Sequence, residues 1–168
     1  MTTRPSFSAA WAASMQIYDP VNSAARVASV VGGKVAANIL PPGQAGKWGN
    51  TCAVRLSYVL NKTGVLIPHT PGKTVSGADH RWYFHYVRDV IQFLQQRWGK
   101  PDLVASFPPT GGGELSGKKG LVLFEVEGWA DATGHATLWN GTVCYDHCYF
   151  NEPGVRYRTP KANFWRLP

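Results

Sequence analysis

Apolar residues in the first part of the chain recur every three or four positions, the spacing that places side chains on one face of an α-helix. The first such series comprises Phe7, Trp11, Met15 and Tyr18. A second helix is predicted over residues 22–31, because Asn22 is a favourable N-cap and a pair of glycines follows. The chain is therefore expected to begin with two short amphipathic helices.

A third helix is predicted to start after a Gly-rich loop, with Asn50 or Thr51 as its N-cap, and to end near Asn61. Its apolar face comprises Ala53, Leu56, Val59 and Leu60. The longest helical pattern runs from Asp79 to Trp98, where a glycine and then a proline follow. The first part of the chain is thus predicted to be mainly helical.

From Gly120 onward the pattern changes to that of β-strands, after a Gly- and Pro-rich segment at 106–119 that is predicted to be a loop. The predicted strands are residues 121–126, 134–139 and 142–150, with two short edge strands at 156–159 and 163–167. Helices followed by a run of antiparallel strands are typical of an α+β domain. Because the sequence has no repeat, low-complexity tract or linker, residues 1–168 are expected to form a single domain in which N-terminal helices pack on a C-terminal antiparallel sheet.

The composition excludes several classes of protein. Apolar residues make up 44% of the chain, so we expect a folded domain with a substantial core rather than a disordered segment. No apolar run approaches the ~20 residues of a membrane-spanning helix, so no membrane insertion is expected. The short apolar stretch near the N-terminus is interrupted by Pro5, Ser6 and Ser8, so we expect no cleavable signal peptide.

The charge balance favours either an anionic partner or simply a solvated positive surface. The chain has 17 Lys+Arg against 10 Asp+Glu, a formal net charge of +7. Such a balance favours contact with nucleic acid, a membrane surface or the carboxylate-rich bacterial wall. The basic residues are scattered and form no long run, so a nucleic-acid-binding tail is not predicted.

Asn140-Gly141 is a strong signal for a two-residue type I′ β-turn, because both central residues of that turn need positive φ. His135 lies five residues before Asn140, and Asp146 lies five residues after Gly141. Such a turn places His135 and Asp146 directly opposite each other, with Cα atoms about 4.5–5.5 Å apart. A carboxylate in that position holds an imidazole in one tautomer and stabilises its charged form. Cross-strand polar pairs are also common structural hydrogen bonds, so the pair alone leaves both interpretations open.

Cys52 is predicted to lie in the first turn of the third helix. The helix dipole and a neighbouring imidazolium lower the pKa of a thiol in such a place, and the thiolate is the nucleophile of cysteine enzymes. Backbone N–H groups at the same helix start can also stabilise an oxyanion. A lone cysteine is more often a small buried apolar residue. The chain order Cys52, His135, Asp146 is that of papain-like enzymes, and the joint occurrence of the three favours a cysteine amidase.

Cys144 and Cys148 enclose Asp146 and His147 in a second cysteine pattern. A metal site is not predicted, because zinc motifs draw ligands from two separated clusters and the chain offers one. His147 is expected to point to the opposite strand face from Asp146. A disulfide between the two cysteines would require the strand to bend, because extended residues four apart are about 13 Å apart. The other histidines, for which the sequence offers no partner and a surface position is expected, are His69, His80 and His85.

Three segments carry a more specific signal: Asn50–Ser57, Gly134–Gly141 and Cys144–Phe150. In chain order they read NTCAVRLS, GHATLWNG and CYDHCYF. Together they resemble the type VI secretion amidase effectors of family four, over about residues 10–168. Three ordered motifs at suitable separation are far more specific than any one of them.

The resemblance implies an NlpC-like, papain-type fold and hydrolysis of bacterial peptidoglycan, at the amide bond between γ-D-glutamate and meso-diaminopimelate in a peptide stem. By motif, Cys52 would be the nucleophile, His135 the general base and acid, and Asp146 the orienting group. The resemblance also implies a disulfide between Cys144 and Cys148. No cofactor is expected.

The resemblance further implies a route and a partner. Such a protein is made in the donor cytoplasm without a signal peptide, is injected by the type VI secretion machinery, and acts in the periplasm of the recipient. A cognate immunity protein protects the producer by blocking the active site. Delivery to an oxidising compartment reconciles a disulfide with the lack of an export signal.

Two alternatives remain at this point. A housekeeping or phage NlpC-like wall hydrolase would use the same triad, but such enzymes usually carry an export signal or a wall-binding module. A non-enzymatic basic module that binds glycan or nucleic acid is the other alternative. It is less well supported, because most of the aromatic residues fall at core spacing rather than along a basic groove.

Overall fold

The structure, a computed structural model, describes residues 3–168, so the first two residues of the expected domain lie outside the described part. The helices are α1 (Phe7–Ile17), α2 (Ser23–Val31), α3 (Gly33–Ile39), α4 (Cys52–Lys62), α5 (Val87–Trp98) and the short 3₁₀ helix η1 (Thr110–Leu115). The strands are β1 (Thr74–Ser76), β2 (Trp82–Phe84), β3 (Leu103–Ser106), β4 (Gly120–Glu127), β5 (Gly134–Trp139) and β6 (Arg158–Arg166). Within residues 3–168, no helix is long and apolar enough to cross a membrane.

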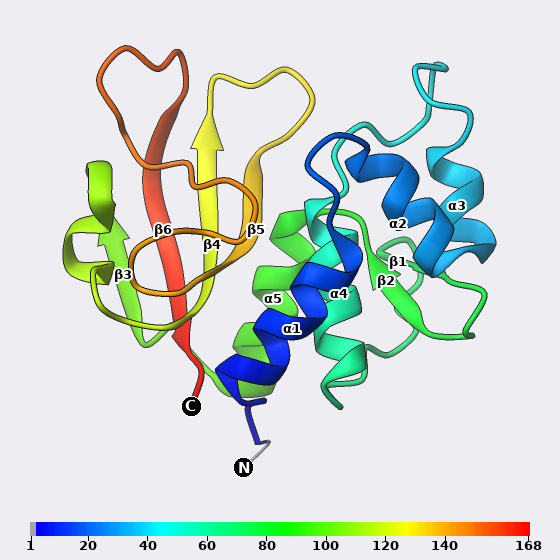
Figure 1. Cartoon of the computed structure of the whole chain (residues 1–168), viewed down its shortest axis with the longest axis horizontal. Helices are drawn as coiled ribbons and strands as arrows, with labels where there is room; N and C mark the ends of the chain where they lie inside the picture. The colour runs from blue at the N-terminus through cyan, green and yellow to red at the C-terminus, as the bar shows by residue number, and fades with distance from the viewer. Residues whose placement is uncertain (1–2) are drawn as a thin grey trace.

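Three helices separate two groups of elements. Figure 1 shows α1, α4 and α5 in the middle of the molecule, with a four-stranded sheet on one side and α2, α3 and the β1–β2 hairpin on the other. Both chain ends lie at the same end of the molecule, where the Phe7 N–H donates to the Pro168 carbonyl at 2.6 Å. Helices precede an antiparallel sheet in the chain, so the predicted α+β fold class is confirmed.

The four-stranded sheet has the order β3-β6-β4-β5, and all neighbouring strands are antiparallel. Alternate residues of β4 enter different cores. Leu121 and Leu123 pack with α1, α4 and α5, whereas Val122 and Phe124 pack with η1 and the segment around Phe150. Burial on both faces explains why this strand is a continuous apolar run. β5 is an edge strand, and the candidate site lies beside it.

Two helix predictions are confirmed closely. Asn22 is the N-cap of α2 and Gly32 its C-cap, as expected. Thr51 is the N-cap of α4, which ends at Lys62. All four residues of the predicted apolar face of α4 are buried, namely Ala53, Leu56, Val59 and Leu60.

The first helix is present, but its predicted face is partly wrong. The buried residues of α1 are Ala10, Ala13, Ser14 and Ile17. Met15 is 55% exposed, whereas Phe7 and Trp11 are half-buried at the border of the core. Alanine is only weakly hydrophobic, so the pattern was dominated by the bulky aromatic residues. These lie at the edge of the buried face and not at its centre.

The helix predicted from Asp79 to Trp98 is wrong over its first part, because only Val87–Trp98 is helical. Trp82–Phe84 is instead β2, which pairs antiparallel with β1. The Phe84 N–H donates to the buried Ser57 hydroxyl on α4 at 2.9 Å. Tertiary contacts therefore hold this aromatic-rich segment extended, even though its apolar residues continue the helical spacing.

The predicted third strand, Thr142–Phe150, is also wrong. Only one isolated bridge, Trp139 to Cys144, continues from β5 across the turn. The turn has four residues instead of two: the Asn140 N–H donates to the Val143 carbonyl at 3.1 Å. The reason is the Asn140 side chain, whose amide oxygen accepts from the backbone N–H groups of Thr142 and Val143 at 2.9 and 2.8 Å.

The remaining differences concern short elements. The two predicted edge strands are a single strand, β6, which lies inside the sheet between β3 and β4. The pattern did not predict α3 or β3, and the loop predicted at 106–119 contains η1. These elements are short, and their positions are set by packing more than by local pattern.

Candidate active site

Cys52 is the first residue of α4 and its side chain is almost fully buried, with 2% exposure. The Gly-rich loop before it contributes Asn50, whose side-chain oxygen accepts from the Cys52 backbone N–H at 3.1 Å. The predicted position at a helix start is therefore correct. Among the backbone N–H groups at this helix start, that of Cys52 therefore already has a partner in Asn50.

His135 on β5 brings an imidazole between the thiol and a carboxylate. Its Nε2 lies 3.0 Å from Asp146 Oδ2, and their side chains are 6% and 2% exposed. The same imidazole hydrogen-bonds to the Cys52 side chain, which leaves Nδ1 for the thiol. The structure thus brings together all three residues that the sequence proposed as catalytic.

The route by which Asp146 reaches His135 differs from the prediction. The four-residue turn shifts the strand register by two residues, so Asp146 does not lie opposite His135 in a ladder. It lies in an irregular segment after Cys144 and turns back toward β5. There its Oδ1 accepts from the Thr137 hydroxyl at 2.5 Å. Thr137 lies two residues after His135, on the same face of the strand.

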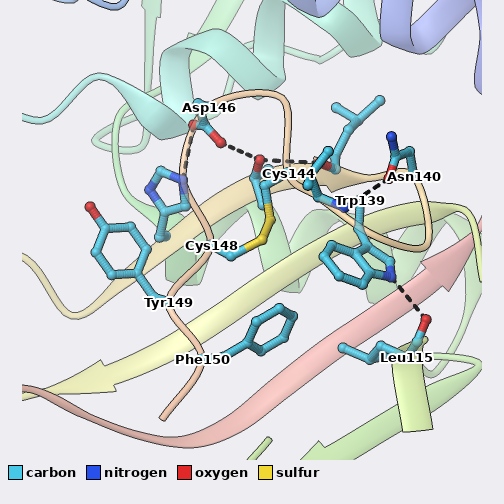
Figure 2. Close-up of a disulfide and its surroundings, with 12 residues drawn as sticks. Leu115, Trp139, Asn140, Cys144, Asp146, Cys148, Tyr149 and Phe150 are labelled. Carbon is cyan, nitrogen blue, oxygen red and sulfur yellow. Dashed lines mark hydrogen bonds and ion pairs between the residues drawn. A yellow bond between two sulfur atoms is a disulfide. The ribbon is translucent and has the colours of Figure 1, made fainter. Parts of the chain in front are cut away.

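A disulfide between Cys144 and Cys148 closes the segment that carries Asp146 (Figure 2). The two Cα atoms are 5.5 Å apart, far less than in an extended strand, so the chain bends as a bridge requires. Behind the disulfide, the Trp139 indole donates to the Leu115 carbonyl at 2.8 Å. The Asp146 segment is therefore fixed at its base by a covalent link and by a buried aromatic layer.

Mutual charge stabilisation shifts the pKa values of all three groups. Burial opposes the charged form of each. At Cys52 and at Asp146 the neighbouring cations and hydrogen bonds together outweigh burial, with His135 the main contributor, and the pKa of each lies below its ordinary value. For His135, the carboxylate and the thiolate outweigh burial and raise its pKa to about 9. The site therefore favours a thiolate–imidazolium pair at neutral pH, as nucleophilic cysteine chemistry requires.

Asp146 also has a second cationic neighbour, which the sequence analysis missed. Arg55 Nη2 lies 3.1 Å from Asp146 Oδ2, and the arginine side chain is 7% exposed. Two cationic side chains, those of His135 and Arg55, therefore lie at ion-pair distance from the same carboxylate oxygen. Arg55 follows Cys52 by one helical turn within the first motif, and that spacing is the signal that points to it.

A cleft of about 360 Å³ opens onto Cys52 and onto Gly134, the residue before His135. Trp48 and His85 form part of its wall, with their rings stacked at 4.8 Å. The surface prediction for His85 is only partly correct, because the residue is half-buried and its Nδ1 is buried with no hydrogen-bond partner within the described chain. His85 precedes α5 and is not part of the helix predicted over that segment.

The remaining histidines do not belong to the thiol–imidazole–carboxylate series, although His147 adjoins Asp146 in the chain. His147 is exposed, as are His69 and His80. His69 stacks on Trp82 at 4.1 Å, so its ring has a partner that the sequence did not indicate. Among residues 3–168, no group of three or more His, Cys, Asp or Glu side chains is arranged to hold a metal ion.

The chain is similar to a known family of proteins. A model of Tae4, the type VI secretion system (T6SS) amidase effector protein 4, matches residues 48–165. The chain belongs to the Tae4 family. The matched segment begins just before the nucleophile candidate Cys52 and extends through β6 to Trp165.

Solved structures of the family resemble the whole fold. The chain is 39% identical to the effector Tae4 from Salmonella typhimurium in complex with the immunity protein Tai4 from Enterobacter cloacae, with a TM-score of 0.85 over 98% of this chain and 100% of that one. It is also 39% identical to Tae4 from Enterobacter cloacae, with a TM-score of 0.83 over 99% of each chain. A comparison with curated proteins gives no significant match. As a Tae4 family member, the chain is a type VI secretion amidase effector, which agrees with the resemblance seen in its motifs.

Proposed function

We propose that this effector is a peptidoglycan amidase that hydrolyses the bond between γ-D-glutamate and meso-diaminopimelate with Cys52, His135 and Asp146. The observation that carries the proposal is the buried thiol–imidazole–carboxylate series beside an open cleft. Membership of an amidase effector family supports the same class of reaction. The bond itself is inferred from the resemblance of the motifs.

In the proposed mechanism, the Cys52 thiolate attacks the carbonyl carbon of the γ-D-glutamyl amide. A tetrahedral oxyanion forms near the first-turn N–H groups of α4, where the helix dipole favours negative charge. His135 then gives its proton to the departing amine of diaminopimelate, and the C–N bond breaks. The products of this half-reaction are the free amine and a thioester on Cys52.

Water completes the cycle. His135, now neutral, takes a proton from a water molecule that attacks the thioester carbonyl. The C–S bond breaks, the thiolate–imidazolium pair forms again, and the γ-carboxylic acid of glutamate leaves and releases its proton to solvent. Throughout, Asp146 holds the imidazole in the tautomer that presents Nδ1 to the thiol and stabilises its charged form.

The proposal includes the biological setting. The protein would be secreted by the type VI machinery, act on peptide stems in the recipient periplasm, and be neutralised in its producer by a cognate immunity protein. The solved Tae4 relatives in complex with Tai4 support such a partner. The formal charge of +7 favours binding to an acidic wall, although salt weakens this attraction.

Purified wild-type and Cys52→Ala proteins, incubated with isolated peptidoglycan, test the proposal by mass spectrometry of the released muropeptides. We expect the wild-type protein to produce stems that end at glutamate, together with peptides that begin at diaminopimelate. The Cys52→Ala variant should produce neither. Full activity of Cys52→Ala, or cleavage at a different bond, would overturn the proposal.

A further inference from the structure

Arg55 is the buried charged residue at the site to which the mechanism assigns no part. We propose that Arg55 is a positioning residue, which holds Asp146 against His135 from the helix turn that follows Cys52 and balances the charge of the buried site. The inference rests on the proposed function. It adds a fourth residue that touches neither the substrate nor the reacting sulfur.

The geometry joins the two sides of the site through one atom. Arg55 Nη2 and His135 Nε2 lie 3.1 and 3.0 Å from the same oxygen, Asp146 Oδ2. Thr137 occupies the other carboxylate oxygen. Because Arg55 and Cys52 lie one turn apart on α4, this contact fixes the distance between the helix that carries the thiol and the segment that carries the carboxylate.

The position of the guanidinium is itself well defined. It lies over the rings of Tyr18 and Tyr145, at 4.9 and 5.7 Å from their centroids. Tyr18 is the C-cap of α1, so Arg55 also contacts a third element. Aromatic faces of this kind attract a cation and hold its plane.

Arg55 has fewer hydrogen bonds than a buried arginine with a purely structural role would need. Its Nε and Nη1 are buried, and neither has a hydrogen-bond partner within the described chain. Buried unpaired donors cost stability, and native proteins keep few of them. A side chain retained in this state, with its one ion pair directed at Asp146, indicates a role in the site.

The charges of the site balance only when Arg55 is included. In the reactive state, Cys52 and Asp146 are negative and His135 and Arg55 are positive, so the buried group is neutral. Without Arg55, the same state carries a net negative charge in a largely dry volume, which disfavours the thiolate. The other titratable or charged groups that face this region are Tyr18, Tyr145, Tyr149, His85, Tyr86, Lys47 and Asp131.

The pH dependence of Cys52 alkylation by iodoacetamide tests the inference, because this reaction reports the thiolate and needs no peptidoglycan. Cys52 is the one free cysteine among the described residues. In Arg55→Met we expect the acid limb of the alkylation curve to move up by about 0.5–1 pH unit. Arg55→Lys keeps the charge, so its alkylation curve should lie close to that of the wild-type protein. Arg26→Met removes an exposed arginine on α2 and should leave the curve of the wild-type protein unchanged.

Kinetics with peptidoglycan provide the second readout. Arg55→Met should lose roughly tenfold to hundredfold in kcat with little change in KM, because the substrate is not contacted. If Arg55 acts through Asp146, the double variant Arg55→Met/Asp146→Asn should lose much less than the product of the two single losses. Should Arg55→Met fail to fold, Arg55→Gln, which removes the charge but keeps a polar side chain, takes its place in the cycle.

A folded Arg55→Met protein with the alkylation curve and kcat of the wild type would overturn the inference, as would fully multiplicative losses in the cycle. Failure of the proposed function looks different. In that case Cys52→Ala retains its activity on peptidoglycan, whatever happens at Arg55. The two failures are therefore separable.

Discussion

The candidate site has two sides that are built in different ways. On one side, Cys52 begins a helix whose next two turns are buried in the main core, so regular backbone hydrogen bonds and apolar packing fix its position. On the other side, Asp146 lies in an irregular segment fixed by a disulfide and by side-chain contacts from Thr137, His135 and Arg55. A regular element positions the candidate nucleophile, whereas individual contacts position the candidate orienting group. The two sides should therefore respond differently to substitution.

His135 is the residue that the two sides share, so removing it should have the largest effect. We expect His135→Ala to lose at least about 10³-fold in kcat, because both the ion pair with the thiol and the proton donor for the leaving amine disappear. Muropeptide release measured by chromatography checks this. His147→Ala, an exposed histidine on the Asp146 segment, is the matched control and should retain full activity. Equal losses in both variants would assign the effect to the fold and not to the chemistry.

Asp146→Asn tests the irregular side alone. We expect a loss of roughly 10²-fold or more in kcat, because an amide does not stabilise the imidazolium and permits the wrong tautomer. The thiol should remain in place, since α4 does not depend on this side chain for its packing. Asp19→Asn, on the turn after α1, should be neutral. Normal activity in Asp146→Asn would show that the carboxylate is only a structural partner of Thr137 and Arg55.

The two sides also differ in how far the sequence could predict them. The position of Cys52 follows from a cap and an apolar face within about a dozen residues, and both were predicted correctly. The meeting of His135 and Asp146 was predicted through a two-residue turn that does not form. The Asn140 side chain accepts hydrogen bonds from the N–H groups of Thr142 and Val143, which favours a longer turn. The Asn-Gly pattern predicts a turn but does not show that this side chain would lengthen it.

Other parts of the fold depend on contacts between distant residues. The extended conformation of Trp82–Phe84 requires Ser57 from another element, and the contact of Arg55 with Asp146 requires the bend closed by Cys144 and Cys148. Neither is encoded within a local window. The sequence therefore predicted the helix that carries Cys52 well. It also predicted that His135 and Asp146 meet, but it did not predict the backbone path that brings them together.

The pH dependence of kcat/KM should depend on both sides of the site, because it reports the protonation of Cys52 and of His135. The pKa of Cys52 is lowered and that of His135 is raised to about 9, so the thiolate–imidazolium pair exists between these two values. We expect kcat/KM to reach a plateau near neutral pH and to fall by about tenfold per pH unit above 9, as His135 loses its proton. In Asp146→Asn the alkaline limb should move to lower pH, because the carboxylate raises the pKa of His135. A plateau that continues beyond pH 10 in the wild-type protein would contradict this assignment.

Removal of the disulfide should affect the irregular side and leave α4 intact. For a loop of this length, the Cys144→Ser/Cys148→Ser variant should lose about 2 kcal/mol in the free energy of unfolding. Its kcat should fall while the alkylation of Cys52 near neutral pH changes little, because the thiol is held by the other side of the site. Urea unfolding and iodoacetamide kinetics measure the two quantities. Loss of thiol reactivity in parallel with kcat would show that the two sides are not separable.

The turn before Asp146 offers the smallest and most local test. Gly141 has a φ of 100°, and a Cβ placed there would lie 3.0 Å from backbone atoms of Gly117. Gly154 has a φ of 82° with no atom within 4 Å of such a Cβ, so Gly154→Ala carries the backbone strain alone. We expect Gly154→Ala to lose about 1 kcal/mol in the free energy of unfolding, and Gly141→Ala to lose about 1 kcal/mol more.

Because the Gly117 N–H also donates to the Gly141 carbonyl at 2.9 Å, this close approach holds the turn against the rest of the fold. Equal losses in the two variants would show that the turn moves freely away from Gly117, and that the disulfide and the contacts of Asp146 are sufficient to place the carboxylate.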